Sequence, residues 1–287
     1  MSEHYPVFIP SKGRAETCLT PHALDEIGVP YRLVVEPHEV NAYVARFGAN
    51  KVIELDLSYK DEYKKLDNKG MSKSTGPGPA RNFAWQVARD EGHYAHWVMD
   101  DNIQGFGRLH KGERIKSVTD APITAMEAWF ARYKNLAMAG PIYKMFAVPG
   151  YINNPFSLNT RIYSCNLIRN DAPFEWRGRY NEDTILSLDM CKAGWCTVQF
   201  YAFWQDKMRT QVLGGGNTDE FYSHEGTYHK SRMLEKTHPD LCRVQWRFGR
   251  WHHIASFAKF KKQKLVPRPK HEWPSYEPPN LKKVKVK

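Results

Sequence analysis

The sequence predicts an α/β protein with a mixed, mostly parallel sheet that is flanked by helices. Short apolar runs alternate with helical patterns through the first third of the chain, and this alternation is typical of parallel strands covered by helices. A second indication is the apolar run His96–Met99, which ends abruptly in the carboxylates Asp100 and Asp101. Open α/β sheets present their ligand-binding groups at such strand ends.

The first elements follow this alternation in order. An apolar run at residues 5–10 leads into a Ser-Lys-Gly-Arg loop, and a second run at 31–36 ends in a carboxylate, Glu36. Both runs have the length and composition of strands. The predicted elements are a strand at 5–10, a loop at 11–14, a helix to about residue 27, a strand at 31–36, a helix at 38–47 and a strand at 51–55.

A long loop separates these elements from the strand that ends in Asp100. Residues 60–79 are charged and then rich in Gly, Ser and Pro, and regular patterns resume directly after them, which is typical of a functional loop inside a domain. The later patterns predict a helix at 80–91, the strand to Met99, a helix at 123–139, strands at 144–148 and 161–166, a helix at 183–193, a strand at 196–203, a turn at 213–218, helices at 219–236 and 239–248, and an extended tail beyond Lys264.

Composition indicates a soluble globular protein. Hydrophobic residues make up 41% of 287 positions, and no apolar run approaches the roughly 18 residues of a membrane span. The polar start predicts no signal peptide, so a cytoplasmic protein without a membrane partner is expected. Five cysteines form neither an even disulfide set nor a paired zinc motif, which predicts reduced, partly buried thiols.

The net charge of +11 favours a polyanionic partner. Lysines and arginines gather in the C-terminal part of the chain, where aromatic residues interleave with them. This combination suits phosphate contact together with base stacking, and Lys259, Lys261 and Lys262 are candidates for nucleic-acid contact. The alternative is a basic tail that is only solvated.

Asp100 and Asp101 are candidate metal ligands. Adjacent carboxylates at a strand end repel each other, and a divalent cation such as Mg²⁺ or Mn²⁺ is the natural partner of such oxygen ligands. The alternative is an Asp-Asp-Asn turn that caps the loop.

Glu182 and Asp183 begin a predicted helix. Carboxylates are favoured at a helix N-terminus on electrostatic grounds alone. The functional alternative is that one of them is a general base, which takes a proton from an attacking hydroxyl. The second acidic pair, Asp100 and Asp101, supports this interpretation.

Three further positions are candidate nucleotide contacts. Glu36 could accept hydrogen bonds from a nucleoside, and Arg81 and Asn82, at a helix start, could meet a diphosphate or the base. An ordinary cap or surface pair is the alternative for each. The triple glycine that includes Gly215 and Gly216 could fold over bound phosphates, or it could act as a hinge. His224 or His229 could be a third metal ligand, and the alternative for each is a residue on a helix surface.

Taken together, these segments resemble the GT-A nucleotide-sugar glycosyltransferases, especially the inverting family 2 type. Val7–Arg14 is similar to their first strand and loop, and Val34–Glu36 to the second strand. Gly78–Asn82 resembles the family's segment at the start of the helix that precedes the metal-binding strand. Met99–Asn102 stands where the DxD motif belongs and departs from it at Asn102. Asn181–Asp183 resembles the family's ED motif.

The resemblance spans about residues 5–230 and implies a GT-A (Rossmann-like) fold with a UDP-sugar donor and Mn²⁺ or Mg²⁺. It implies that Asp100 meets the ribose and Asp101 the metal, and that Asp183 is the base with Glu182 beside it. Donor contacts are expected from Pro10, Ser11, Arg14, Glu36, Arg81, Asn82, Asp100, Gly215 and Gly216, and metal contacts from Asp101, Asp100 and His224.

The GT-A resemblance does not explain the basic, aromatic C-terminal third. The combination of the two parts is similar to the bacteriophage branch called TET/JBP-associated glycosyltransferases. That likeness implies transfer to hydroxymethylated pyrimidines in phage DNA, in the host cytoplasm. Trp176 and Arg177, just before the base, are candidates to hold a flipped pyrimidine, or else they pack in the core. We expect a glycosyltransferase domain at 1–235 and a helical, basic, aromatic extension at 236–287.

Three rival functions remain open on the sequence. The same donor site could serve a protein, glycan or lipid acceptor. A nucleotidyltransferase also uses a nucleotide, a metal and paired acids, although it would give the Glu-Asp motif no role. The chain could also be a non-catalytic nucleic-acid-binding module.

Overall fold

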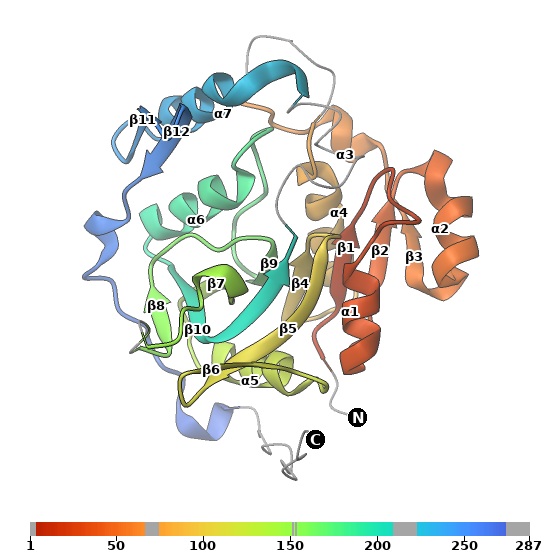
Figure 1. Ribbon diagram of the computed structural model, residues 1–287, viewed down its shortest axis with the longest axis horizontal. Coiled ribbons are helices and arrows are strands. Elements are labelled where there is room, and N and C mark those ends of the chain that lie inside the picture. Colours follow the sequence, from red (N-terminus) through yellow and green to blue (C-terminus); the bar gives the residue numbers. More distant parts are fainter. Residues whose placement is uncertain (1–3, 67–74, 151, 153, 209–222, 274–287) are drawn as a thin grey trace.

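The computed structural model describes residues 4–66, 75–150, 152, 154–208 and 223–273, with backbone alone at 223–227. Within these residues one ten-stranded mixed sheet forms the centre of the molecule (Figure 1). Its strand order is β3 (Val52–Glu54), β2 (Arg32–Val35), β1 (Val7–Pro10), β4 (Ala95–Met99), β9 (Cys165–Arg169), β7 (Leu136–Tyr143), β10 (Cys196–Lys207), β5 (Ile103–His110) and β6 (Glu113–Lys116), with β8 (Phe156–Leu158) paired to β10.

The parallel part of the sheet places the candidate acids at one edge. β1 pairs in parallel with β2 and β4, and β2 pairs in parallel with β3. The carboxyl ends of these strands therefore lie on the same side, and Asp100 directly follows β4. The α/β mixed sheet predicted from the sequence is confirmed and is consistent with the GT-A arrangement.

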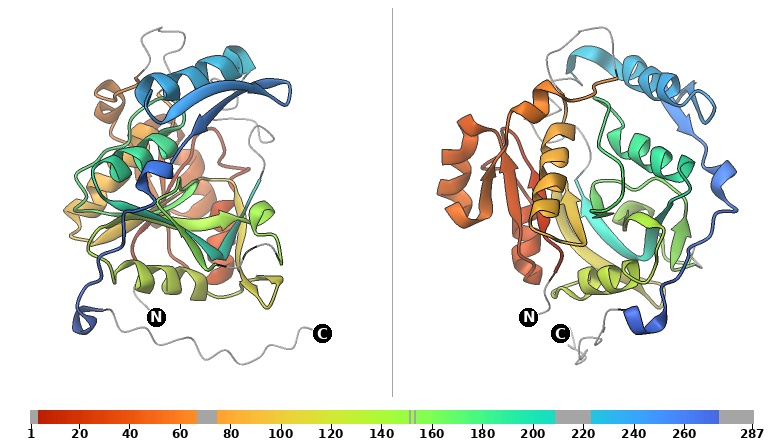
Figure 2. Two further views of the ribbon diagram at one scale, coloured as in Figure 1. Left: turned by 90° about the vertical axis from the view of Figure 1, so that its left-hand side faces the viewer. Right: turned by 180° about the vertical axis from the view of Figure 1, so that it is seen from behind.

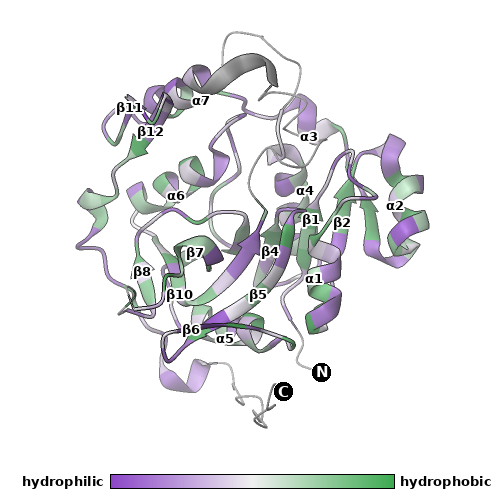
Figure 3. Ribbon diagram, in the orientation of Figure 1, coloured by the Kyte–Doolittle hydropathy of each residue, from purple (hydrophilic) through white to green (hydrophobic). Residues whose placement is uncertain are grey.

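Helices cover both faces of the sheet. In β1, Val7 and Ile9 pack with α1 (Thr20–Ile27) and α5 (Ala121–Phe130), whereas Phe8 packs with α4 (Gly78–Asp90) on the other face. This alternation follows from the two-residue period of a strand. Figure 3 shows the resulting concentration of hydrophobic residues in β1 and β2. The remaining helices are α2 (Val40–Phe47), α3 (Ser58–Asp61), α6 (Glu182–Lys192) and α7 (Ser223–Thr237).

Two elements in the middle of the chain differ from the sequence prediction. The predicted helix at 123–139 ends at Phe130, and its last residues, 136–139, belong to strand β7. β7 is buried along almost its whole length, so its sequence lacks the alternation of a half-buried strand and cannot be distinguished from a buried helix by periodicity. The predicted strand at 144–148 is a 3₁₀ turn over Lys144–Phe146, and the one at 161–166 lies at Cys165–Arg169.

The C-terminal part is not the helical extension that the sequence predicted. The segment expected as a helix at 239–248 forms β11 (Cys242–Arg247), which pairs with β12 (Arg250–Ala255) in an antiparallel hairpin. Phe248 and Gly249 make the turn with φ values of 51° and 72°. Two consecutive positive φ values are typical of the tight turns whose twist matches a hairpin.

The hairpin and α7 are joined to the core. Leu188 of α6, Leu234 of α7 and Leu241 belong to one buried hydrophobic cluster. The boundary expected between 235 and 236 falls inside α7. In the part of the chain that the structure describes, no helix has the length and apolar character needed to cross a membrane.

Candidate active site

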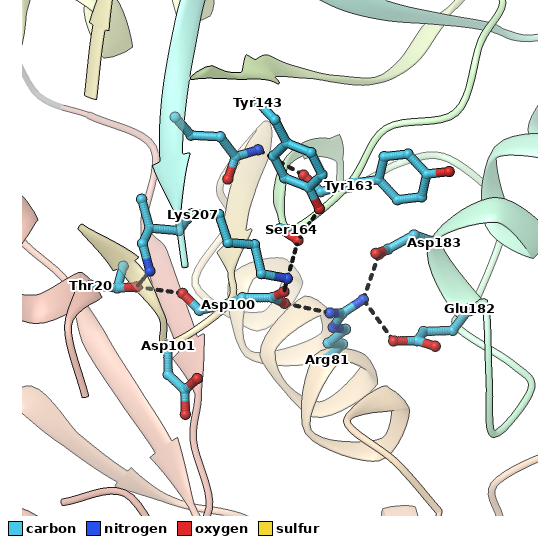
Figure 4. Close-up of polar contacts among 12 residues, drawn as sticks. Thr20, Arg81, Asp100, Asp101, Tyr143, Tyr163, Ser164, Glu182, Asp183 and Lys207 are labelled. Carbon is cyan, nitrogen blue, oxygen red and sulfur yellow. Dashed lines mark hydrogen bonds and ion pairs between the residues drawn. The ribbon is translucent and has the colours of Figure 1, made fainter. Parts of the chain in front are cut away.

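Four elements bring charged side chains together at the carboxyl edge of the sheet. Asp100 follows β4, Arg81 lies in the first turns of α4, Lys207 ends β10, and Glu182 and Asp183 begin α6 (Figure 4). Asn181, just before α6, has a left-handed backbone with φ of 54°, a conformation that Asn tolerates better than most residues. This kink starts α6 so that both acids face Arg81 (Figure 4).

Arg81 lies at the centre of the site. Its buried guanidinium donates to Asp183 Oδ1 at 2.6 Å and to Asp100 Oδ1 at 2.8 Å, and it lies 3.5 Å from Glu182 Oε1. The Trp176 ring lies beneath it, 4.5 Å from the guanidinium carbon to the ring centroid. Burial alone would lower the pKa of Arg81, but the three carboxylates raise it above its ordinary value.

Asp100 is held between two cations. Lys207 Nζ donates to Asp100 Oδ2 at 2.5 Å and to Ser164 Oγ at 2.7 Å, and Ser164 Oγ lies 2.8 Å from Tyr143 Oη. Burial would raise the pKa of Asp100, but Lys207 and Arg81 lower it to about 2. Asp100 is therefore held in its carboxylate form by its two cationic partners.

Asp101 points away from Asp100 (Figure 4). Its carboxylate accepts hydrogen bonds from Ser11 Oγ and from Arg14 Nη1, both at 2.7 Å. Tyr43 Oη lies 2.8 Å from Ser11 Oγ and accepts from the Arg14 amide at 3.1 Å. Asp101 thus fixes the loop after β1, and burial raises its pKa against the opposing effects of Arg14 and Ser11.

Glu182 and Asp183 are both more basic than free carboxylates. Burial, reinforced by Asp183, raises the pKa of Glu182 to about 7, although Arg81 opposes the shift. Burial also raises the pKa of Asp183, again opposed by Arg81. Among the described residues, Asp183 Oδ2 receives no hydrogen bond, so this oxygen is open to a proton from a bound molecule.

The family of the chain follows from comparison with known proteins. The family model described as TET-Associated Glycosyltransferase matches residues 5–216. The chain belongs to this family. It is therefore a glycosyltransferase, and its donor is a nucleotide-sugar. A search of the curated proteins gives no match.

Two residues that we expected to contact the acceptor, Trp176 and Arg177, bind other residues of this glycosyltransferase instead. Trp176 is fully buried under Arg81, and its backbone N–H and C=O pair with the Asn82 amide at 2.7 and 2.9 Å. Trp176 is therefore not at the surface to contact DNA, and Asn82 holds the Trp176 backbone. Arg177 is bound through two nitrogens to Asp189, at 2.7 and 2.8 Å.

Other expected donor contacts have partners outside the cluster around Arg81. Glu36, after β2, accepts from Lys60 at 2.8 Å and lies 3.1 Å from Lys12, and these lysines lower its pKa although burial opposes them. Pro10 ends β1. Gly215 and Gly216 lie outside the described residues, as does the His224 side chain.

The lysines at 259–262 lie at the far end of α6. Gln263, directly after them, donates to the Cys191 carbonyl at 2.7 Å, whereas the catalytic candidates are at the start of that helix. At about 1.5 Å per residue, the helix separates the two ends by about 16 Å. Contact of Lys259, Lys261 and Lys262 with nucleic acid remains a prediction.

Lys207 is the residue that sequence reasoning missed. It follows Asp206 at the end of a strand with no motif around it, and only the register of β10 beside β5 and β7 brings it to Asp100. The one signal in the sequence that could have indicated Lys207 is its position after a predicted strand, where charged side chains reach the carboxyl edge of the sheet.

The described residues do not fit a divalent cation at this edge. Both oxygens of Asp100, and both of Asp101, already accept from donors of this chain. No group of three or more His, Cys, Asp or Glu side chains in the described ranges could hold a metal. An ion bound to Asp100 Oδ2 would lie within about 5 Å of Lys207 Nζ and be repelled by about 7 kcal/mol at an effective dielectric constant of about 20.

The raised pKa of Glu182 predicts a pH-dependent loss of stability. An unfolded glutamate loses its proton near pH 4.5, whereas folded Glu182 keeps it to about pH 7. The free energy of unfolding should therefore fall as pH rises through this window, because only the folded state binds the proton. Urea unfolding of the native protein and of Glu182→Gln should show a difference that changes between these values and is constant outside them. A pH-independent difference would contradict the shift.

Proposed function

We propose that this glycosyltransferase moves a sugar from a UDP-sugar to the hydroxyl of a hydroxymethylated pyrimidine in DNA, with inversion at the anomeric carbon. The observation that carries the proposal is the Asp183 carboxylate beside Arg81 at the carboxyl edge of the sheet, where α/β proteins bind their ligands. The family association with TET enzymes favours a modified DNA base as the acceptor.

Asp183 is the proposed general base. Arg81 holds one of its oxygens, and burial raises its pKa, which makes it a better proton acceptor than a solvated aspartate. As the acceptor oxygen attacks the anomeric carbon, its proton passes to Asp183 Oδ2 and the bond to the diphosphate breaks, which releases UDP. Glu182 shares Arg81 with the base.

The donor is proposed to lie along the ends of β1, β2 and β4. Glu36 at the end of β2 suits a nucleoside, while Ser11 and Arg14 belong to the loop that Asp101 fixes. Arg81, at the start of α4, faces the expected diphosphate, and the positive end of that helix adds to its charge. We assign no step to a divalent ion, because the described residues do not fit one.

A DNA acceptor is supported by charge. The net charge of +11 favours phosphate contact, and a base inside a duplex has to be flipped out to reach a buried carboxylate. A protein, glycan or lipid acceptor would give no reason for this charge. A nucleotidyltransferase would leave Asp183 without a role.

The direct test is incubation of the protein with hydroxymethylated DNA and a panel of UDP-sugars. We expect a hexose or pentose mass to be added to the modified nucleoside after digestion, and none to unmodified cytosine or thymine. The absence of any sugar on DNA, together with UDP release on a glycan or protein acceptor, would reject the DNA assignment.

Asp183→Asn is expected to lower kcat by about 10² to 10⁴. UDP binding should stay within about twofold of the native value, since Asn can still accept from Arg81. Calorimetric UDP titration and sugar transfer to DNA measure the two effects. A variant that keeps most of its turnover would show that another group takes the proton.

A further inference from the structure

The β11–β12 hairpin presents a basic and aromatic face that the family match does not include. Residues 242–255 contain Arg243, Arg247 and Arg250 and no acid, and they lie beyond the matched residues 5–216. Figures 1 and 2 place the hairpin along α7, on the side of the molecule opposite α2 and β3.

Strand register puts the three arginines on one face. Arg247 pairs with Arg250, and Arg243 pairs with Ile254, so these positions alternate with Val244 and Trp246 along the strands. All three arginines are exposed. The opposite face contacts α7, because the rings of Trp251 and Tyr228 lie 5.2 Å apart.

The turn adds an exposed aromatic ring to the arginine face. Phe248 is 92% exposed and lies 6.0 Å from the His252 ring, which is on the same face as the arginines. Trp246 is 56% exposed and packs on Trp251. An aromatic ring exposed to water is unfavourable until a partner covers it. Base stacking is a partner chemistry that tolerates flanking arginines.

The hairpin is connected through α7 to the helix that carries the proposed base. The Val244 amide donates to Glu235 of α7 at 3.0 Å. Asn181, the residue before Glu182, donates to the Lys230 carbonyl of α7 at 2.8 Å. A ligand on the hairpin is thereby positioned relative to the start of α6.

We propose that this face binds the DNA that carries the acceptor base, with the arginines on phosphates and Phe248 stacked on or between bases. A two-stranded ribbon fits the major groove, and an apolar wedge lowers the cost of unstacking a base. The proposal rests on the proposed function and names the surface that supplies its acceptor.

The test compares two triple variants that remove the same charge. Arg243→Gln with Arg247→Gln and Arg250→Gln should weaken binding to a duplex oligonucleotide containing 5-hydroxymethylcytosine, and should lower the slope of log K against log salt by about 2 to 3. The matched comparison changes Lys259, Lys261 and Lys262, the other predicted nucleic-acid contacts, to Gln and should weaken binding much less than the hairpin variant does. Phe248→Ala should weaken binding about 5- to 150-fold.

If the two triple variants weaken DNA binding equally, only the total charge matters and the proposal is overturned. Unchanged DNA binding by the hairpin variants would also overturn it. A dimer in sedimentation that these arginines maintain, with DNA binding intact, would assign the face to a second copy instead. UDP release from UDP-sugars without DNA should be unchanged in every variant. A native protein that shows no such release and no transfer would reject the proposed function, whereas the DNA-binding comparison would still decide the hairpin.

A second inference concerns Lys207 and rests on a separate observation. Its ammonium lies 2.5 Å from Asp100 and 2.7 Å from Ser164, with the Tyr143 ring centroid at 6.0 Å, so the charge is held by a buried polar set at the carboxyl edge of the sheet. We infer that Lys207, together with Arg81, supplies the positive charge that faces the donor diphosphate in place of a divalent cation. This inference also rests on the proposed donor reaction.

UDP binding measured by calorimetry tests this role without requiring turnover. The native protein should bind UDP in EDTA, with less than about a twofold change on adding Mn²⁺. Lys207→Ala should weaken binding by about 10- to 150-fold, the range of one lost charged hydrogen bond, and Lys207→Arg should restore most of it. Lys144→Ala removes a lysine paired at 2.5 Å with Asp206 outside the site and serves as control.

Native UDP binding that requires Mn²⁺ would overturn the inference, and so would a Lys207→Ala variant that binds UDP like the native protein in EDTA. Thermal unfolding of each variant separates a lost contact from a lost fold. If UDP binds as expected but no sugar is transferred to any acceptor, the proposed reaction is rejected while the role of Lys207 in UDP binding stands.

Discussion

The buried guanidinium of Arg81 is the interaction on which the site depends. It joins Asp100 after β4, Asp183 and Glu182 of α6, and the Trp176 ring, so three separate parts of the chain meet on one cation. Removing one partner of a buried charge pair typically costs about 3 to 5 kcal/mol, because the remaining charge stays unpaired. The position of Asp183, the proposed base, and the contact of α6 with α4 are therefore set by the same guanidinium.

The sequence predicted the parts of the fold in which local pattern and tertiary position agree. The strands at 5–10 and 31–36 and the acids after Met99 follow from short apolar runs that end in polar residues. The first half of β7, residues 136–139, and all of β11 were wrongly predicted as helical. β7 is buried too completely to show a period, and β11 takes its form from pairing with β12, a partner that no single segment reveals.

In the site, the sequence predicted which acidic residues are present but not the direction of their side chains. Asp100 and Asp101 are adjacent in sequence, but one carboxylate meets Arg81 and Lys207 while the other meets Ser11 and Arg14. Their opposite directions follow from their places beyond a strand end, and no composition rule gives them. Lys207 lies 107 residues after Asp100, so only the sheet topology could show that a lysine occupies this edge.

The arrangement of α6 and α7 connects the proposed active site with the hairpin that we propose binds DNA. Asn181 has the left-handed backbone that starts α6, and its side chain also donates to the Lys230 carbonyl of α7. α7 in turn holds the hairpin through Glu235 and Tyr228. Because the proposed base and the hairpin proposed to bind DNA are both attached to α7, a shift of α7 would move both of them. If the hairpin binds the acceptor DNA as proposed, the fold itself orients the acceptor relative to Asp183, and such orientation contributes to rate.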